Sequence, residues 1–494
     1  MIYGNNIGDQ ETKLGENVFQ TINPLLNTFN THSFVEATSE EIHLACSMAH
    51  AVFHEYALTS YASRSLFLHR IASLLADEKE EILASYCMES GLPKSRGETE
   101  LHRTIVQLLN FSELLKSEDE LGVYEESDLN RLPFPKPSLR NIKRPIGPIA
   151  VFGASNFPLA YSTIGGDSVA ALAAGCPIIV KSHPYHAGTS YLVAQLVIRA
   201  IKESGMPLGI FAHLNGFEHK IGAQLAVHPY VKGIGFTGSR KGGLALIDYV
   251  QQRHIPIPVF AEMSCVNPII IYPSYLSSNE LGILADTIAN SICGGAGQFC
   301  TKPGVLFMIE DAISASFVIH LQNAVQTHPS NVMLHPQIYN QYEHDCKLAS
   351  NQEGVLKLTI DRPITLNNQG NPHLNIVSGK DFLINQVLQK EVFGPYSLIV
   401  LCASDAELDS IVVSLDGQLT FSVFSELPLI ELEVYDLLLD KAGRIIYNGV
   451  PTGVEVSSAM QHGGPFPSSS DSRFTAVGTN SIDRFRRSVC LQGL

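Results

Sequence analysis

Hydrophobic and polar positions change their spacing near residue 145, which divides the chain into two kinds of predicted structure. Before that point, residues 39–56, 66–81 and 101–115 place Leu, Ile and Ala on one side and charges on the other, with helical periodicity. Residues 1–125 are therefore expected to be mostly helical. After Gly147, short apolar runs alternate with amphipathic stretches, a pattern typical of alternating strands and helices.

The apolar runs after Gly147 predict buried parallel strands at 149–152, 178–180, 210–214, 231–236, 257–260, 269–272, 305–309, 397–401, 420–424 and 444–448. The stretches between them predict helices at 162–174, 190–203, 218–227, 240–252, 281–292, 312–327 and 405–415. Strict alternation with short connections favours parallel βαβ units in a doubly wound α/β fold. A Pro-rich stretch at 132–137, followed by 139–143, predicts an exposed arm or edge hairpin. The tail is expected to be loop at 462–472 and a short element at 476–494.

The composition excludes several classes of protein. The chain has 494 residues, 45% hydrophobic content and a formal net charge of −15, which suits a folded globular protein and disfavours binding to a nucleic-acid backbone. Its nine cysteines include no CxxC pair, so no metal site is expected. The apolar segment 145–180 is too broken by Gly and Pro to span a membrane. The polar N-terminus lacks the features of a secretory signal, so we expect a cytoplasmic protein.

The sharpest candidate for chemistry is Cys300, in the run Gly-Gly-Ala-Gly-Gln-Phe-Cys-Thr-Lys-Pro-Gly at 294–304. Glycines let the backbone approach a ligand closely, and a reactive thiol needs partial exposure near N–H groups or cations. The alternative is a buried structural cysteine in a Gly-rich turn.

Two further candidates follow predicted strands. Glu262 ends the apolar run Phe260-Ala-Glu, where α/β sheets present catalytic groups, although an ordinary loop glutamate is the alternative. Asn156, in Ser-Asn-Phe-Pro after the strand at 149–152, can donate to an oxyanion or merely form a turn.

The segment 233–238 formally matches the dinucleotide pattern GxGxxG. However, Gly233 and Gly235 fall inside a predicted strand, whereas the pattern requires its glycines at a strand–helix turn. Only Gly238 and Ser239 stand at a predicted helix start, where backbone N–H groups can hold a pyrophosphate. Lys181, at another strand end, can meet a ribose or a phosphate, or can simply be solvated.

Several motifs share one order and spacing along the chain: Ser-Asn156-Phe-Pro, Val-Lys181, Phe236-Thr-Gly-Ser, Ala-Glu262-Met, Gly-Gln-Phe-Cys300 and Glu391-Val-Phe-Gly-Pro. Together they closely resemble the aldehyde dehydrogenase superfamily over nearly the whole chain. Other stretches resemble its NADP-dependent branch, which contains 2-oxoglutarate semialdehyde (2,5-dioxopentanoate) dehydrogenases and a bacterial fatty-aldehyde dehydrogenase. These stretches are Gly-Gly-Asp167, Lys-Ser-His-Pro, His462-Gly-Gly-Pro-Phe-Pro and Ser-Asp471-Ser-Arg-Phe-Thr.

The resemblance implies an architecture and a role for each matching residue. A Rossmann-type cofactor-binding domain would comprise 1–125 and 145–258, an α/β catalytic domain 259–460, and a β oligomerisation arm 126–144 and 470–494. Cys300 would be the nucleophile, Glu262 the base for deacylation, and Asn156 an oxyanion donor. The cofactor would be held by Lys181, Gly238, Ser239, Glu391 and Phe393.

The departures from the family pattern concern the cofactor. Many NAD-using relatives carry a glutamate three residues after the lysine, where this chain has Pro184. Loss of an acid that would repel a 2′-phosphate favours NADP while permitting NAD, and His219 or Lys220 could supply a compensating positive charge. Asp167 stands where common relatives have Ala or Pro, and the sequence offers no reason for it.

The resulting hypothesis is a homodimeric or homotetrameric NAD(P)-dependent enzyme that oxidises an aldehyde to an acid through a thiohemiacetal and a thioester. The expected substrate is 2-oxoglutarate semialdehyde, with Arg473 as the partner of its carboxylate or, alternatively, as a structural residue. A long-chain fatty aldehyde is the competing substrate. A cysteine-dependent hydrolase is disfavoured because no histidine lies in the Cys300 loop, and a non-catalytic family member is disfavoured by the retained site residues.

Overall fold

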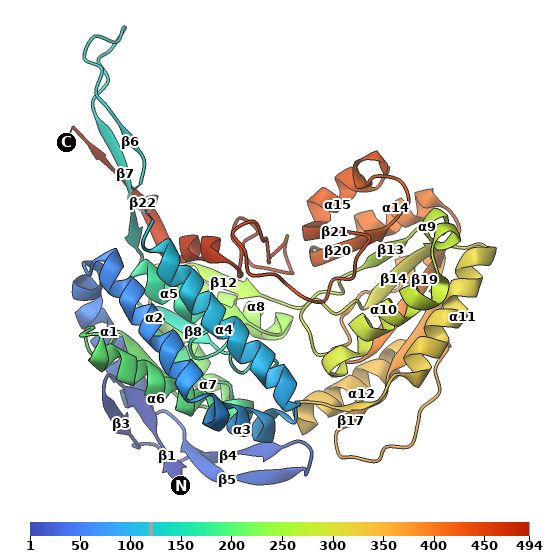
Figure 1. The fold of residues 1–494 in the computed structure, drawn as a ribbon, viewed down its shortest axis with the longest axis horizontal. Helices are drawn as coiled ribbons and strands as arrows, with labels where there is room; N and C mark the ends of the chain where they lie inside the picture. The colour runs from blue at the N-terminus through green and yellow to red at the C-terminus, as the bar shows by residue number, and fades with distance from the viewer. Residues whose placement is uncertain (118–121, 494) are drawn as a thin grey trace.

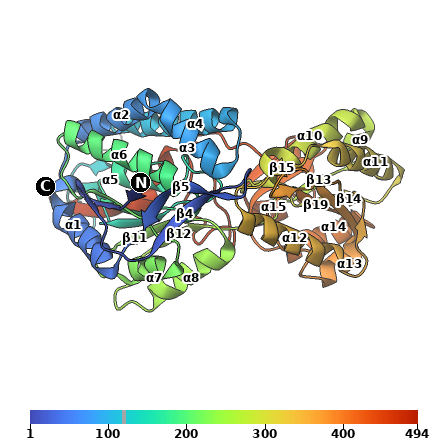
Figure 2. The ribbon, with the colours of Figure 1, turned by 90° about the horizontal axis from the view of Figure 1, so that it is seen from below.

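The computed structural model describes residues 1–117 and 122–493 as two α/β lobes, with a narrow arm projecting from the first lobe (Figure 1). Residues 118–121, in the predicted cofactor-binding segment 1–125, and residue 494, in the predicted arm segment 470–494, lie outside the described residues. Seen from below, the two lobes lie side by side (Figure 2). The chain between 450 and 485 returns from the second lobe to the first (Figure 1).

The sheet of the first lobe has seven strands in the order β12-β11-β8-β9-β10-β2-β3. The five consecutive strands from β12 to β10 run parallel, and the two N-terminal strands extend the sheet antiparallel at the other edge. The strands are β2 (Asn5–Ile7), β3 (Gln10–Thr12), β8 (Ile149–Phe152), β9 (Ile178–Lys181), β10 (Phe211–Leu214), β11 (Gly233–Thr237) and β12 (Val259–Glu262).

Helices cover both faces of this sheet because successive strand residues point to opposite sides. Ile149 and Val151 enter one apolar core, whereas Ala150 enters the other. The first core is built with α2 (Tyr61–Asp77), α3 (Lys79–Ser90), α4 (Lys94–Leu114), α5 (Asp167–Ala174) and α6 (Ala187–Glu203). The second is built with α1 (Ser39–Ala57), α7 (His219–Val227) and α8 (Arg240–Gln251).

The second lobe contains another seven-stranded sheet, in the order β16-β18-β19-β14-β13-β20-β21. Its strands are β13 (Ile269–Ile271), β14 (Val305–Ile309), β16 (Leu356–Lys357), β18 (His373–Ser378), β19 (Tyr396–Cys402), β20 (Gln418–Phe424) and β21 (Ala442–Tyr447). Its helices are α9 (Pro273–Ser278), α10 (Leu281–Cys293), α11 (Ala312–Thr327), α12 (Pro336–Ser350), α13 (Gly379–Ile384), α14 (Asp405–Ser414) and α15 (Tyr435–Lys441). The two faces again carry separate apolar cores, and β15 (Asn331–Val332) pairs with β17 (Gln369–Gly370) beside them.

The arm is a three-stranded antiparallel sheet in the order β22-β7-β6. It joins β6 (Tyr124–Glu125), β7 (Leu139–Pro145) and β22 (Arg486–Gln492), so the exposed hairpin expected near 132–143 pairs with the chain's last strand. The 3-10 helix η5 (Thr479–Phe485) precedes β22 and packs on α5 and α4.

The expectation of mostly helical structure in residues 1–125 is wrong for the first 35 residues. They form β1 (Ile2–Tyr3), β2, β3, β4 (Val18–Asn23) and β5 (Thr28–Val35). Polar contacts fix part of this region: the Asn5 side-chain oxygen accepts the backbone N–H of Asn215 at 2.8 Å. Because polar side chains such as Asn5 make these contacts, the strands lack the alternation of apolar residues from which strands are predicted.

The helix predicted at 162–174 begins at Asp167, because Gly166 takes a φ of 52° and ends the preceding turn. Asp167 now has an explanation. Its Oδ1 lies 2.6 Å from Nη1 of Arg484, and both side chains are buried. This ion pair ties the start of α5 to the segment that leads into β22.

The rejection of 233–238 as a dinucleotide fingerprint is confirmed, because Gly233 and Gly235 lie inside β11. Among residues 1–117 and 122–493, no helix has the length and apolar character needed to cross a bilayer.

Candidate active site

Loops of the first lobe meet where the strand order of its sheet reverses. β8 lies between β9 and β11. After β8 the chain adds β9 and β10 on one side of it, and then adds β11 and β12 on the opposite side. The carboxyl ends of parallel strands at such a reversal form the crevice where α/β proteins bind ligands. Asn156 follows β8, Lys181 ends β9 and Ser239 follows β11, so these three predicted residues reach the same edge.

Cys300 follows α10 and the 3-10 turn η3 (Gly294–Gly297) in a backbone that requires glycine. Gly297 has a φ of 64°, in the left-handed region that strains other residues. A Cβ at Gly297 would lie 2.3 Å from the carbonyl carbon of Gly394. Glycine therefore lets the cysteine loop contact the loop at 391–396 directly.

The imidazole of His462 joins the two reactive groups singled out from the sequence. Its Nε2 lies 3.6 Å from Sγ of Cys300 and 3.1 Å from Oε1 of Glu262. Ligand-type atoms of all three residues lie within 4.8 Å of one another. A thiol, an imidazole and a carboxylate in contact can pass protons and activate a nucleophile.

The C-terminal segment that carries His462 is held against β12. Ser469 forms a β-bridge with Glu262, and the Met263 N–H donates to the Ser468 carbonyl at 2.8 Å. Within the segment, the Ala476 N–H donates to the His462 carbonyl at 2.7 Å. The imidazole is therefore placed by the same backbone that covers Glu262.

Burial and charge act in opposite directions on this cluster. Burial alone would lower the pKa of His462, but the Glu262 carboxylate and the Cys300 thiol outweigh burial and raise that pKa well above its usual range. Burial raises the pKa of the Cys300 thiol, and His462 opposes this effect. A protonated imidazole at neutral pH therefore lowers the cost of forming the thiolate.

Asn156 points at the backbone that leads to the cysteine. Its Nδ2 donates to the carbonyl of Gln298 at 3.0 Å, which leaves the second amide hydrogen for another acceptor. Its loop is anchored by the buried Glu100 of α4, whose Oε1 accepts the N–H groups of Leu159 and Ala160 at 2.8 and 3.1 Å.

The predicted cofactor residues of the first lobe surround the starts of two helices. Ser239 caps α8, and its Oγ accepts the Gly242 N–H at 3.2 Å. A Cβ at Gly238 would lie 2.8 Å from the Phe236 ring, so this helix start has no room for a side chain. Burial lowers the pKa of Lys181 to about 8, and the carboxylate of Glu36 opposes that effect.

The second helix start carries charges of both signs. His219 and Lys220 open α7. Glu36 approaches the same turn, and its Oε1 accepts the N–H groups of Phe217 and Glu218 at 2.6 and 3.1 Å. Pro184 lies in the 3-10 turn η2 (Pro184–His186), directly after β9.

Glu391 and Phe393 lie in the loop that contacts the cysteine turn. Burial raises the pKa of Glu391 to about 7, with Lys302 as the leading opposing charge. Lys302 is itself buried, and its Nζ donates to the carbonyls of Val392 and Tyr396 at 3.0 and 2.9 Å. Lys302, two residues after the cysteine, thus anchors this loop through two hydrogen bonds.

Arg473 lies on the surface, away from this cluster of contacts. Its side chain is 79% exposed, and Nη2 lies 2.6 Å from Oδ2 of Asp471. Its Nε also donates to Asp471, at 2.9 Å.

Sequence reasoning did not assign roles to three residues of this site: His462, Lys302 and Glu100. His462 stood in a quoted motif, but it is separated from Cys300 by 162 positions. No specific signal marked the other two: Lys302 stands in the Gly-rich cysteine run and Glu100 directly precedes the helix predicted at 101–115, and charged residues in such places are ordinarily exposed.

Known proteins resemble this chain over nearly its whole length. Residues 11–360 match the aldehyde dehydrogenase family. The chain is 42% identical over 464 residues to an alpha-ketoglutaric semialdehyde dehydrogenase of Acinetobacter baylyi, covering 93% of this chain and 88% of that protein. It is 38% identical over 463 residues to alpha-ketoglutaric semialdehyde dehydrogenase 2 of Azospirillum brasilense, with the same coverages of 93% and 88%.

Solved structures share the fold at low sequence identity. A 1-pyrroline-5-carboxylate dehydrogenase superposes with a TM-score of 0.83 at 19% identity, covering 99% of this chain and 92% of that one. A betaine aldehyde dehydrogenase of Staphylococcus aureus in complex with NAD+ gives 0.86 at 18% identity, covering 99% and 97%. The aldehyde-dehydrogenase-like α/β fold that the motifs implied is confirmed. The chain belongs to the aldehyde dehydrogenase family.

Proposed function

We propose that this aldehyde dehydrogenase oxidises 2-oxoglutarate semialdehyde to 2-oxoglutarate, with NADP as its preferred cofactor. The observation that most directly supports this proposal is the contact of Cys300, His462 and Glu262 in one cluster. Relatives named for the same semialdehyde, at 42% and 38% identity, support the choice of substrate.

The proposed chemistry follows from the donors and acceptors around the thiol. At neutral pH the protonated His462 stabilises the thiolate that forms when the Cys300 thiol loses its proton to water, and this thiolate adds to the aldehyde carbon to give a thiohemiacetal. The second N–H of Asn156 and the Cys300 backbone N–H donate to the oxygen that gains charge. Glu262 later removes a proton from the water that cleaves the thioester, and the protonated His462 stabilises the departing thiolate.

The residues present fit a nicotinamide dinucleotide. The start of α8, where Gly238 has no side chain and Ser239 caps the helix, suits a pyrophosphate, and Lys181 would meet the adenosine ribose. Glu391 and Phe393 would hold the nicotinamide ribose and ring beside the cysteine turn. When bound, the nicotinamide supplies the two-electron acceptor that makes the oxidation possible.

The preference for NADP rests on Pro184 and Lys220. Pro184 removes the acid that would oppose a 2′-phosphate, and Lys220 in the first turn of α7 supplies a positive charge. Glu36 is the opposing group, but its carboxylate already accepts two backbone N–H groups.

Steady-state kinetics test both parts of the proposal. We expect a higher kcat/KM with NADP than with NAD, and a higher kcat/KM for the semialdehyde than for a long-chain aldehyde such as dodecanal. A clear NAD preference would overturn the cofactor assignment. A tenfold preference for dodecanal would overturn the substrate assignment.

A cysteine-dependent hydrolase is a second candidate, because the contact of His462 with Cys300 supplies the histidine that the Cys300 loop lacks. Such an enzyme would cleave an activated ester without cofactor and would form no reduced cofactor with any aldehyde. Production of NADPH in step with aldehyde loss rejects it.

We also propose that the arm binds a second copy of this chain, giving a homodimer or homotetramer. Its apolar side chains are open to solvent, with Leu132 and Phe134 88% and 73% exposed. An apolar patch of this kind on a projecting element is typical of a protein interface.

A further inference from the structure

One face of α4 contacts the loop that carries Asn156. Arg96, Glu100 and Arg103 follow at helical spacing, so they lie on the same side of the helix. Glu100 anchors the loop through the N–H groups of Leu159 and Ala160. The two arginines stand one turn to either side of this anchor.

The guanidinium of Arg103 is only partly used by the protein. Its Nη1 donates to the Val454 carbonyl, and its Nη2 makes a long contact of 3.4 Å with the Tyr161 hydroxyl. Its Nε is buried and has no acceptor among the residues that the structure describes. Nε and Nη2 form one side of the guanidinium fork, and this side matches the two oxygens of a carboxylate.

The Nε and Nη2 side of the fork lies beside Tyr161, whose ring neighbours the loops of the reactive cluster. The Tyr161 hydroxyl that Arg103 contacts belongs to a buried ring, and this ring is part of an aromatic series that leads to the cysteine loop. Tyr161 also packs edge-on against Phe157, with ring centroids 5.4 Å apart. Phe157 in turn lies 6.1 Å from Phe299, the residue before the cysteine.

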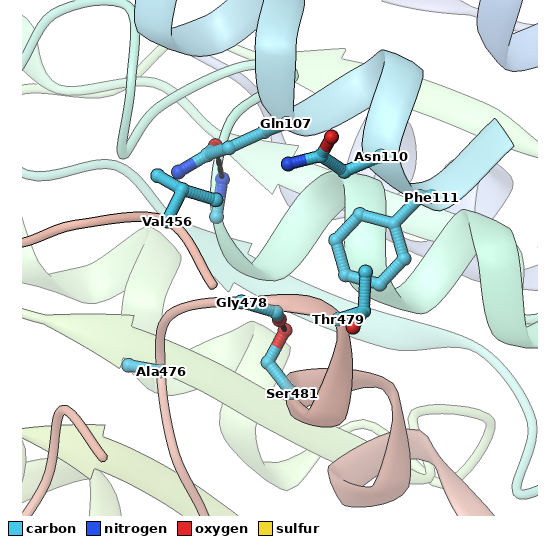
Figure 3. Close-up of a pocket in the computed structure, with 9 residues that line it drawn as sticks. Gln107, Asn110, Phe111, Val456, Ala476, Gly478, Thr479 and Ser481 are labelled. Carbon is cyan, nitrogen blue, oxygen red and sulfur yellow. Dashed lines mark hydrogen bonds between the residues drawn. The ribbon is translucent and has the colours of Figure 1, made fainter. Parts of the chain in front are cut away.

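The neighbouring polar groups on this face already have partners. Arg96 lies over the rings of Phe157 and Phe299, at 4.7 and 4.6 Å from their centroids. One turn beyond Arg103, Gln107 accepts the Gly166 N–H at 3.1 Å. The cavity beside Gln107 measures about 10 Å³, room for about one water and not for a substrate (Figure 3).

We propose that Nε and Nη2 of Arg103, together with the Tyr161 hydroxyl, bind the distal carboxylate of a short aldehyde substrate. The proposal rests on the aldehyde oxidation described above and names the group that selects the substrate. Arg473 is the less suitable partner, because Asp471 occupies the same side of its guanidinium and solvent surrounds it. A carboxylate bound beside Tyr161 would leave the aldehyde end toward Cys300.

The test compares two five-carbon aldehydes, 2-oxoglutarate semialdehyde and uncharged pentanal, in Arg103→Met, Arg103→Lys and the matched surface control Arg473→Met. We expect Arg103→Met to lower kcat/KM for the semialdehyde by about 10- to 100-fold, the range for a hydrogen-bonded charge pair, and to change pentanal less than threefold. Arg103→Lys should recover part of the loss. Arg473→Met should behave as the parent enzyme.

Equal losses on both aldehydes would overturn the proposal, because they would show that Arg103 only supports the Val454 loop. A selective loss in Arg473→Met instead would also overturn it. Inhibition of pentanal oxidation by glutarate gives a second readout, which should weaken at least tenfold in Arg103→Met; unchanged inhibition rejects the carboxylate site. If glutarate inhibits the parent enzyme but the enzyme does not oxidise the semialdehyde, the proposed substrate is wrong while the carboxylate site is still supported.

Discussion

A single nitrogen of His462 faces both the thiol and the carboxylate of the site, so its protonation links the two. Because the imidazole contacts the thiol directly, its charge lowers the pKa of Cys300 relative to burial alone. A buried cysteine without such a partner would keep its thiol neutral, because burial raises the thiol pKa.

His462→Gln removes that influence. Because His462 opposes the rise in the Cys300 pKa that burial causes, the variant should have a still higher thiol pKa. The acid limb of the pH profile of kcat/KM should therefore move to higher pH, with activity lost near neutrality and partly regained in alkali. Alkylation of Cys300 by iodoacetamide, measured in a Cys490→Ser background to remove the exposed thiol, should shift in parallel. An unshifted profile would contradict the role.

Glu262→Gln should separate the two halves of the reaction. The thiol can still attack the aldehyde, so a burst of reduced cofactor should remain, while turnover falls by about 10²- to 10⁴-fold as thioester hydrolysis loses its base. Rapid-mixing absorbance at 340 nm measures both. Cys300→Ala is the control that should show neither burst nor turnover, and a lost burst with normal deacylation would refute the assignment.

Asn156→Ala should lower turnover by about 10²- to 10³-fold, the cost of one oxyanion donor. Its amide also holds the Gln298 carbonyl, so circular dichroism and cofactor binding should be compared with the parent protein. Unchanged turnover would remove Asn156 from the site.

At the scale of elements, the loop at 391–396 depends on a buried lysine of the cysteine turn. Lys302→Met keeps the bulk of the side chain and removes both hydrogen bonds to the loop. We expect the KM for the cofactor to rise about tenfold or more, with a smaller change in kcat, because the loop carries the predicted ribose ligand. Lys390→Met, an exposed neighbour of Glu391, is the matched control. Equal changes in both variants would show that Lys302 has no special role.

The elements that sequence patterns found best are those buried on both sides. The strand predicted at 149–152 is β8 without change, because continuous apolar runs between Gly and Pro signals mark central strands. The N-terminal strands escaped notice because polar side chains such as Asn5 hold them in place. Most of α4 was predicted as a helix at 101–115, but Glu100 lies before that range, and no periodicity reveals which charged face is buried against a loop.

The site itself could be predicted only in part. Cys300, Glu262 and Asn156 stand out through their local settings at strand ends and in a Gly-rich turn. The contact of His462 with Cys300 and Glu262 depends on the bridge between Ser469 of the tail and Glu262 of β12, two residues more than 200 positions apart. Such a contact follows from the tertiary fold, so no spacing rule could supply it.

At the scale of the whole molecule, the projecting arm predicts concentration-dependent assembly. Replacing Leu132 and Phe134 by Ser should weaken association, because both side chains are largely exposed in one chain and would be buried by a second copy. Light scattering coupled to size exclusion should show a smaller mass than for the parent protein. Ile384→Ser, which changes a 78% exposed residue outside the arm, should leave the mass unaltered.

The docking of the tail also determines when, during synthesis, the nucleophile can acquire its histidine. Cys300 leaves the ribosome 162 residues before the histidine that activates it, an interval of roughly 8–30 s at ordinary rates of synthesis. During that interval the thiol has no imidazole beside it. The contact with His462 forms only after the tail has been synthesised and Ser469 has paired with Glu262 of β12, so the assembly of the reactive cluster is one of the last steps in making the protein.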